Sequence, residues 1–409
     1  MSEIKKIDAG VTAAKGFSVA NCAAGIKYQG RDDMAMIYSS VPCAAAGTYT
    51  KNVVKAAPVI WDKQVTTSGI AQAVVCNAGI ANACTGDEGM KMCAQTADAV
   101  AAALSVDANQ VLIASTGVIG FQLPIDKLVN GVNMMKPLLS DSIDAGHKAA
   151  KAIMTTDTVS KEVACTVEIA GKTVTVGGMC KGSGMIHPNM CTMLAFITTD
   201  CAIDQSLLQK ALSTCIVDSF NMISVDGDTS TNDTCVVLAN GLAENDKITT
   251  ENADYDAFLE ALLYVTQNLA KKMAADGEGA THLVECKVIN ADTKENARIL
   301  AKSVICSSLV KAAVYGKDAN WGRIACALGY SGVDFDQYGI DIYYESVSGK
   351  MLVCKNGSNV EFSEEMGVKI LTDDEVTLIC DMHMGTEEAT AYGCDLTHEY
   401  VDINADYRS

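Results

Sequence analysis

The sequence has little proline, which already limits the class of protein. Only 5 of the 409 residues are proline and 32 are glycine. That composition excludes collagen-like chains and proline-rich disordered chains. Hydrophobic residues make up 49% and charged residues 20%, which is ordinary for a globular protein. We therefore expect a chain that folds around a sizeable core.

Long hydrophobic runs are missing as well. The richest apolar stretches, residues 99–106 and 193–197, are far shorter than the roughly 20 residues that a helix needs to span a bilayer. The first ten residues hold two lysines among acidic residues and no apolar stretch, so we expect no secretory signal. These features predict a cytoplasmic protein without membrane contact.

Positive charge is in short supply. The chain carries 31 Lys and Arg against 50 Asp and Glu, a formal net charge of -19. Such a field repels phosphate backbones and anionic membrane surfaces, so we exclude nucleic acid as a partner. A small anionic substrate would need a local cation inside its site, such as a buried lysine or a helix N-terminus.

Patterns of metal ligands are absent too. The 5 histidines show no zinc-ligand spacing, and the 17 cysteines include no Cys-x-x-Cys pair. Cysteines dispersed through a chain of this length are predicted to be small buried hydrophobes in a reducing compartment. Residues 226–232 superficially resemble a calcium loop, but Thr231 and Val237 stand where the loop needs glycine and glutamate. We expect no metal.

What the sequence does contain is an alternation of strand and helix patterns. Short apolar or β-branched segments predict strands at 73–76, 111–114, 163–169, 173–176, 193–197 and 283–289. Helical spacing of apolar residues predicts helices at 89–104, 205–222, 255–275 and 294–315. This interleaving predicts a layered α/β or α+β fold. The turn at 276–280 divides a domain over residues 1–280 from a smaller one over 281–409.

Residues 177–200 contain the strongest candidate for chemistry. A glycine-rich turn leads to Cys191 and Thr192 and then to an apolar run, so Thr192 is predicted at the head of a buried strand. A threonine hydroxyl is a poor nucleophile by itself. If the peptide bond before Thr192 is cut, its new α-amino group, with a pKa near ~8, can take the hydroxyl proton. The alternative is a strand-forming threonine with a satisfied hydroxyl.

The stretch Lys-Gly-Ser-Gly-Met-Ile-His-Pro-Asn-Met-Cys-Thr-Met-Leu, residues 181–194, resembles the autoproteolysis motif of the ornithine acetyltransferase family. The family has alanine where Cys191 stands, a change from one small residue to another. Further blocks match at 77–86, 115–120, 154–158, 228–234 and 318–323, so the resemblance spans nearly the whole chain. It implies a layered αββα-type sandwich with a smaller C-terminal α/β domain. It also implies self-cleavage between Cys191 and Thr192, and a heterotetramer of two alpha and two beta chains.

The resemblance further implies a ping-pong acetyl transfer in arginine biosynthesis. N-acetyl-L-ornithine would acetylate Thr192, and L-glutamate would collect the acetyl group. No cofactor is implied, and whether acetyl-CoA also serves as a donor stays open. The residues that would stabilise the oxyanion are Thr116 and Gly117, which by themselves predict a tight turn after the strand at 111–114.

The substrate contacts that the resemblance implies are Thr155, Lys181, Thr192, Glu278, Asn404 and Ser409. Lys181 suits a carboxylate, and Glu278 suits an ammonium group such as the side chain of ornithine. The glycines beside both residues allow the backbone to approach a ligand closely. The last ten residues are expected to fold back over the pocket.

Two other functions stay open. One is a related self-cleaving aminopeptidase or esterase, which would pass its acyl group to water. The other is a non-catalytic amino-acid-binding protein that keeps the fold but never matures. The first would release acetate even with glutamate present, and the second would carry no covalent acetyl group on Thr192.

Overall fold

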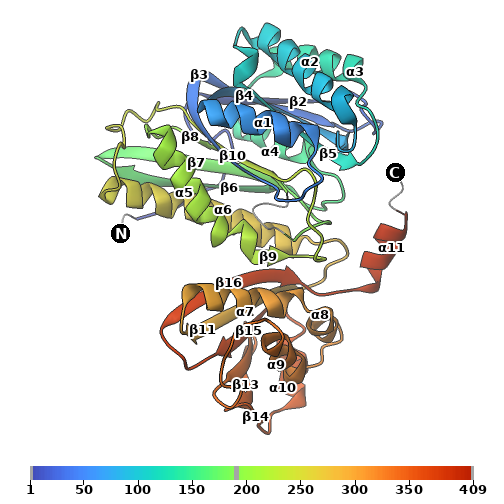
Figure 1. Cartoon of the computed structure of the whole chain (residues 1–409), viewed down its shortest axis with the longest axis vertical. Helices are drawn as coiled ribbons and strands as arrows, with labels where there is room; N and C mark the ends of the chain where they lie inside the picture. The colour runs from blue at the N-terminus through green and yellow to red at the C-terminus, as the bar shows by residue number, and fades with distance from the viewer. Residues whose placement is uncertain (1–2, 188–192, 407–409) are drawn as a thin grey trace.

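The computed structural model describes residues 3–187 and 193–406, and its described strands form two sheets (Figure 1). The first sheet has nine strands, of which β2 pairs with β3 at the side of the main path. In spatial order the main path is β1 (Lys5–Ile7), β6 (Lys161–Ile169), β7 (Lys172–Lys181), β8 (Leu194–Thr199), β10 (Thr234–Ala239), β3 (Met34–Tyr49), β4 (Ile70–Ile80) and β5 (Val111–Val118), with β2 at Phe17–Cys22.

Helices surround the first sheet, and the fourth of them also packs into the core between its two halves. They are α1 (Ala57–Ser68), α2 (Gly86–Leu104), α3 (Ile125–Met135), α4 (Ile143–Ala152), α5 (Gln205–Val217) and α6 (Ala253–Ala275). Short 3₁₀ turns lie at Ala108–Gln110, Lys136–Leu138 and Phe220–Met222. Helices α5 and α6 pack on β3, β6 and β7, whereas α1, α2 and α3 pack on the half of the sheet formed by β2 to β5 (Figure 1).

The alternation of side chains along each strand separates these layers. In β8, Leu194 and Phe196 lie in a core shared with apolar residues of β2, β3, β4 and β5. Ala195 and Ile197 point the other way and pack with α5 and α6. The two halves of the first sheet therefore face each other, with a helical layer outside each half.

Strands β8 and β10 occupy the middle of the first sheet. They pair in parallel with each other, and their outer neighbours are β7 and β3, which both run antiparallel to them. Every residue of both strands is buried. Such apolar runs are typical of strands covered on both faces.

The second sheet has seven strands. In spatial order they are β14 (Ser358–Asn359), β13 (Gly349–Lys355), β12 (Asp341–Ser346), β15 (Glu375–Asp381), β11 (Leu283–Ala291), β16 (Glu387–Cys394) and β9 (Ile223–Ser224). Its helices are α7 (Lys294–Cys306), α8 (Ser308–Tyr315), α9 (Trp321–Gly329) and α10 (Glu364–Ile370), and the last described helix is α11 (His398–Asp406). Residues from α7, α8 and α9 and from the strands β11, β12, β13, β15 and β16 share one core.

The predicted mixed α/β class is confirmed, and each predicted strand overlaps an observed one, although the strand predicted at 193–197 begins one residue before β8. Two helix boundaries were wrong. The helix predicted at 294–315 is broken at Ser307, whose hydroxyl accepts the N–H of Val310 and caps α8. The helix predicted at 205–222 ends at Val217 and is followed by a 3₁₀ turn.

The division predicted between residues 280 and 281 stays a prediction. Helix α6 packs mainly on β6 and β7 of the first sheet and also contacts β16 of the second, and β11 is the first strand after that helix. Strand β9 lies earlier in the chain but pairs with β16 of the second sheet.

Most described cysteines are buried and none is in a disulfide; Cys84 and Cys326 are exposed and Cys306 is half-buried. Among the helices of residues 3–187 and 193–406, none has both the length and the apolar character needed to cross a bilayer.

Candidate active site

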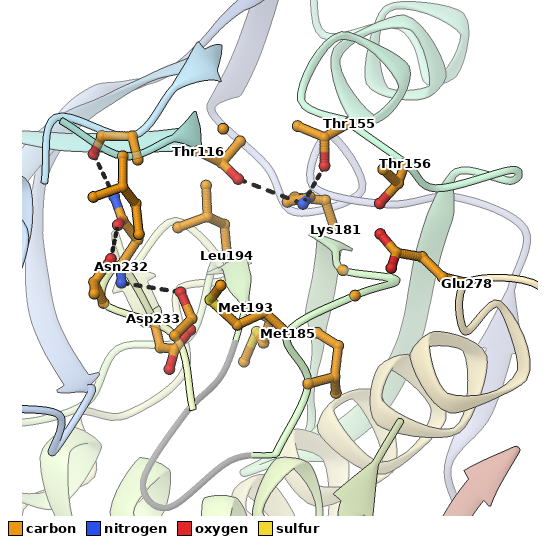
Figure 2. Close-up of a pocket in the computed structure, with 18 of the residues that line it drawn as sticks. Thr116, Thr155, Thr156, Lys181, Met185, Met193, Leu194, Asn232, Asp233 and Glu278 are labelled. Carbon is orange, nitrogen blue, oxygen red and sulfur yellow. Dashed lines mark hydrogen bonds between the residues drawn. The ribbon is translucent and has the colours of Figure 1, made fainter. Parts of the chain in front are cut away.

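A pocket lies where the ends of β5 and β7 and the start of β8 meet the loop before β10 (Figure 2). Met193 and Leu194 line it, next to the residues 188–192 that the structure does not describe. Six of the residues singled out in the sequence also line it: Thr116, Gly117, Thr155, Lys181, Glu278 and Asn404. The other three, Cys191, Thr192 and Ser409, lie outside the described residues, and their roles stay predictions.

Lys181 places a cation in the pocket. It is the last residue of β7 and is paired with Leu194 at the start of β8. Its ammonium donates to Thr155 Oγ1 at 2.7 Å and to Thr116 Oγ1 at 3.4 Å (Figure 2). The side chain is 8% exposed. A lysine held in this way can pair with the carboxylate of a small ligand.

Thr116 and Gly117 do not form the predicted turn. Strand β5 continues through them in parallel with β4, because the pairing of Ser115 with Asn77 carries the ladder past the predicted end. The Ser115 hydroxyl also bonds to the Asn77 side chain at 2.7 Å. The ladder becomes irregular at Gly79, and there Gly117 takes a φ of 132°, which favours glycine.

Glu278 lies on the turn that follows α6, opposite the last helix. Its carboxylate accepts a hydrogen bond from Asn404 Nδ2 at 2.8 Å. A Cβ on Gly279, which has a φ of 68°, would lie 2.6 Å from the backbone nitrogen of Tyr400. Because Gly279 has no side chain, α11 can approach the turn and bring Asn404 to the pocket.

The chain on both sides of residues 188–192 is held by the loop that leads into β10. The Asp226 carboxylate accepts the backbone N–H groups of Met185 at 2.6 Å and Ile186 at 2.9 Å. Burial raises the pKa of this carboxyl above its ordinary value, while the hydrogen bonds oppose that rise. On the far side, Thr234 N–H donates to the carbonyl of Met193 at 2.8 Å.

Asp226 opens the segment that superficially resembles a calcium loop. In the structure its carboxylate is occupied by backbone N–H groups, including that of Asp228 at 3.1 Å. Across residues 3–187 and 193–406, no group of three or more His, Cys, Asp or Glu side chains has the arrangement of a metal site.

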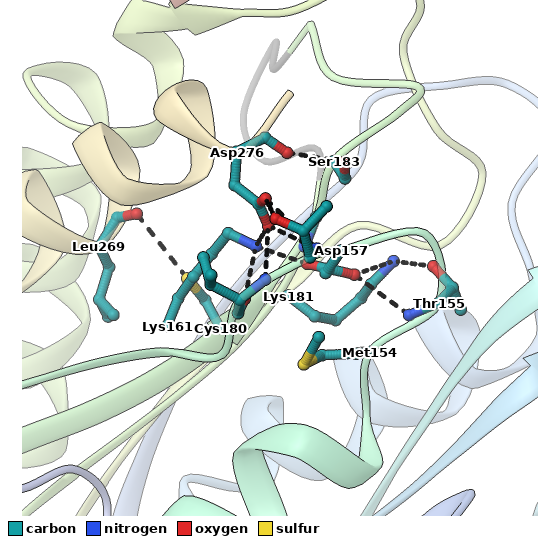
Figure 3. Close-up of polar contacts among 12 residues, drawn as sticks. Met154, Thr155, Asp157, Lys161, Cys180, Lys181, Ser183, Leu269 and Asp276 are labelled. Atoms are coloured by element: carbon teal, nitrogen blue, oxygen red, sulfur yellow. Dashed lines mark hydrogen bonds and ion pairs between the residues drawn. The ribbon is translucent and has the colours of Figure 1, made fainter. Parts of the chain in front are cut away.

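Sequence reasoning missed the buried charges behind the pocket. Asp157, Lys161 and Asp276 form an ion-paired group that adjoins Lys181 (Figure 3). Burial alone would raise the pKa of Asp157, but Lys181 and Lys161 hold it well below its usual range. Asp157 lies inside the block 154–158 that matches the family. The four-residue spacing between Asp157 and Lys161 does not distinguish a buried ion pair from a solvated one.

Asn232 was also missed as a residue that shapes the pocket. Its side-chain amide donates to the carbonyls of Ala81 at 2.5 Å and Ser115 at 2.8 Å. These bonds tie the loop before β10 to the ends of β4 and β5. The result is a cavity lined by one lysine, by the carboxyl groups of Glu278 and Asp233 and by several hydroxyls, which suits a zwitterionic ligand.

Comparisons with known proteins agree with the motifs. The ArgJ family model matches residues 18–409. The arginine biosynthesis bifunctional protein ArgJ of Symbiobacterium thermophilum is 51% identical over 402 residues, which cover 98% of each chain. The protein of the same name from Caldanaerobacter subterraneus subsp. tengcongensis is 47% identical over 98% of this chain and 99% of its own.

A solved structure is similar as well. It is the ornithine acetyltransferase of Mycobacterium tuberculosis complexed with ornithine, 46% identical, with a TM-score of 0.44 over 46% of this chain and 99% of that chain. The family model runs from residue 18 to the end of the chain, and both curated relatives match along nearly their whole length. The chain therefore belongs to the ArgJ family, the ornithine acetyltransferase family that its motifs resemble.

Proposed function

We propose that this acyltransferase of arginine biosynthesis cuts its own chain before Thr192 and then carries acetyl from N-acetyl-L-ornithine to L-glutamate on that residue. Membership of the ArgJ family supports the class of reaction. The observation that carries the finer proposal is the pocket, where Lys181, Glu278 and Thr116 surround the start of β8. Thr192 precedes that start by two residues.

The proposed chemistry needs only groups of this chain and its substrates. In the cut, the Thr192 hydroxyl attacks the Cys191 carbonyl carbon, the acyl group shifts from nitrogen to oxygen, and water hydrolyses the resulting ester. The cut leaves a carboxylate on Cys191 and a free amine on Thr192. That amine then takes the proton of the Thr192 hydroxyl in each transfer.

Acetyl transfer follows in two halves. The Thr192 oxygen attacks the acetyl carbonyl carbon of N-acetylornithine, the C–N bond breaks, and ornithine leaves with the proton held by the Thr192 amine. The amine of glutamate then attacks the acetyl ester and loses a proton, and the Thr192 hydroxyl is restored. Each half passes through a tetrahedral oxyanion, for which we propose Thr116 and Gly117 as donors.

The contacts of Thr116 fit that role. Its hydroxyl oxygen accepts a hydrogen bond from Lys181 Nζ, so its own hydrogen stays available for another acceptor. In the same proposal Lys181 binds a carboxylate of the amino acid, and Glu278 binds the side-chain ammonium of ornithine, next to Asn404.

Intact mass spectrometry tests both steps together. Purified protein should give two chains, one beginning at Thr192, and N-acetylornithine should add one acetyl group to that chain. Glutamate should then remove the acetyl group and yield N-acetylglutamate. A single uncut chain with full activity would contradict the proposal.

Other outcomes of the same measurement distinguish the alternatives. Release of acetate in the presence of glutamate would favour a self-cleaving hydrolase, and ligand binding without any acetyl adduct would favour a binding protein. Acetyl-CoA in place of N-acetylornithine tests a second donor. We also propose that the protein is cytoplasmic and forms a heterotetramer of two alpha and two beta chains without a cofactor. Native mass spectrometry tests the number of chains and the absence of a bound cofactor.

Gly184→Ala should weaken the binding of N-acetylornithine. A Cβ at this position would lie 2.3 Å from the carboxyl group of Glu278, so that carboxyl group must move from its place beside Asn404. We expect KM to rise on the order of ten-fold, the effect of losing one charge-assisted hydrogen bond. Gly329→Ala is the control, because no atom lies within 4 Å of its added Cβ. Equal KM values for the two variants would contradict the role of Glu278.

A further inference from the structure

Lys161 is a cation enclosed between two carboxylates. It begins β6, and its ammonium donates to Asp157 Oδ1 at 2.7 Å and to Asp276 Oδ2 at 2.5 Å (Figure 3). The side chains of Lys161 and Asp157 are 0% exposed, and that of Asp276 is 6% exposed. None of the three lines the pocket. Because a buried charge is tolerated only when it is paired, these groups hold one another in place.

Asp157 extends this group to the cationic side of the pocket. Its carboxylate accepts the backbone N–H of Gly182 at 2.7 Å and that of Thr155 at 3.1 Å. It also forms an ion pair with Lys181 Nζ at 3.7 Å. One carboxylate therefore holds the backbone that follows Lys181. It also holds Thr155, whose hydroxyl accepts a hydrogen bond from the Lys181 ammonium.

Asp276 extends the group to the anionic side. Its carboxylate accepts the backbone N–H and the hydroxyl of Thr158, and its carbonyl accepts the Ser183 hydroxyl at 2.7 Å. The carbonyl of Ser183 in turn accepts the N–H of Glu278 at 3.0 Å. The backbone position of Glu278 therefore depends on Asp276.

We infer that the Asp157–Lys161–Asp276 group fixes the separation between Lys181 and Glu278 and so selects the side-chain length of the donor amino acid. The three are positioning residues, and the inference rests on the proposed function. The two carboxylates of the group are balanced by Lys161 within it and by the adjoining Lys181, so the network carries no excess charge. A ligand with one methylene more or fewer would misplace its ammonium relative to Glu278, whose backbone this network holds in place.

The test compares donors in the full-length protein and its double variant Lys161→Met/Asp276→Asn. This variant removes one positive and one negative charge and leaves Asp157 paired with Lys181. The measurement is kcat and KM for N-acetylornithine and for its homologues with one methylene fewer and one more. The native protein should favour N-acetylornithine in kcat/KM by at least about ten-fold. In the double variant this ratio should fall toward one.

The ratio separates selection from general damage. A variant that is merely less stable would lose activity toward all three donors alike and keep the ratio. The matched control is Asp218→Asn/Arg298→Met, which removes an ion pair with two 2.8 Å contacts at residues that do not line the pocket. The control should keep the native ratio.

A folded and active double variant with the native ratio overturns the inference. If circular dichroism shows that the double variant does not fold, Ser183→Ala decides, because it keeps every charge and removes only the link from Asp276 to the Glu278 turn. An unchanged ratio in Ser183→Ala overturns the inference, and a lowered one supports it. A native protein that acetylates no acceptor with any donor overturns the proposed function and the inference with it.

Discussion

Thr192→Ala is expected to leave the chain uncut and to lower acetyl transfer by roughly 10⁴-fold or more, the scale seen when a catalytic nucleophile is removed. Both steps use the same hydroxyl, which alanine lacks. Thr192→Ser should retain part of both, because serine keeps the hydroxyl. The measurements are the number of chains on a denaturing gel and the rate of N-acetylglutamate formation.

The pair of variants also tests the order of the two steps. The serine chain should be cut before it becomes active, so activity should rise with the fraction of cut chain. An alanine variant that is cut at the same bond would show that another group performs the cleavage. An uncut serine variant with full activity would show that the free amine of residue 192 is not needed.

Gly117→Ala is expected to lower kcat by about 10²- to 10³-fold, the effect of disturbing one donor of an oxyanion site. A Cβ on Gly117 would lie 2.2 Å from the carbonyl carbon of Gly79 and 2.6 Å from the nitrogen of Ile80. These are backbone atoms of the neighbouring strand, so neither can swing aside. The ends of β4 and β5 must separate, and the N–H of Gly117 moves with them.

Gly120→Ala is the matched control for this prediction. Its φ of 89° is also in the left-handed region, but no atom lies within 4 Å of the added Cβ. Both variants carry the strain of a positive φ, on the order of 1–2 kcal/mol, and only Gly117→Ala adds the clash. The melting temperature of each variant measures the strain and kcat measures the site. If kcat were equally low in both, the oxyanion role of Gly117 would be wrong.

The strands of the first sheet could be predicted because burial imposes a simple pattern on them. Residues 163–169 and 173–176 alternate or run apolar, and they lie in β6 and β7. Helix α6 was predicted to within two residues because its apolar positions keep a helical period over 23 residues. The break at Ser307 could not be predicted, because apolar residues recur at helical spacing on both sides of it. Only the cap that Ser307 forms at the start of α8 shows that a new helix begins there.

The site was less open to prediction from local sequence. Thr116 and Gly117 were predicted as a turn since a glycine after a short strand usually ends it, but pairing with distant β4 extends the strand. Lys161 and Asp276 are 115 positions apart in the chain, and no spacing rule joins them. Six of the residues that line the pocket could be named through motifs, whereas the charges that hold them in place required the fold.

The central position of β8 and β10 in the first sheet has a consequence for the fate of the cut protein. A break between positions 191 and 192 would put these two strands on the later fragment, while β7 and β3 on either side would belong to the earlier one. Strands of the later fragment would then be hydrogen-bonded on both sides to strands of the earlier fragment. They should elute together from any column in native buffer and come apart only in denaturant.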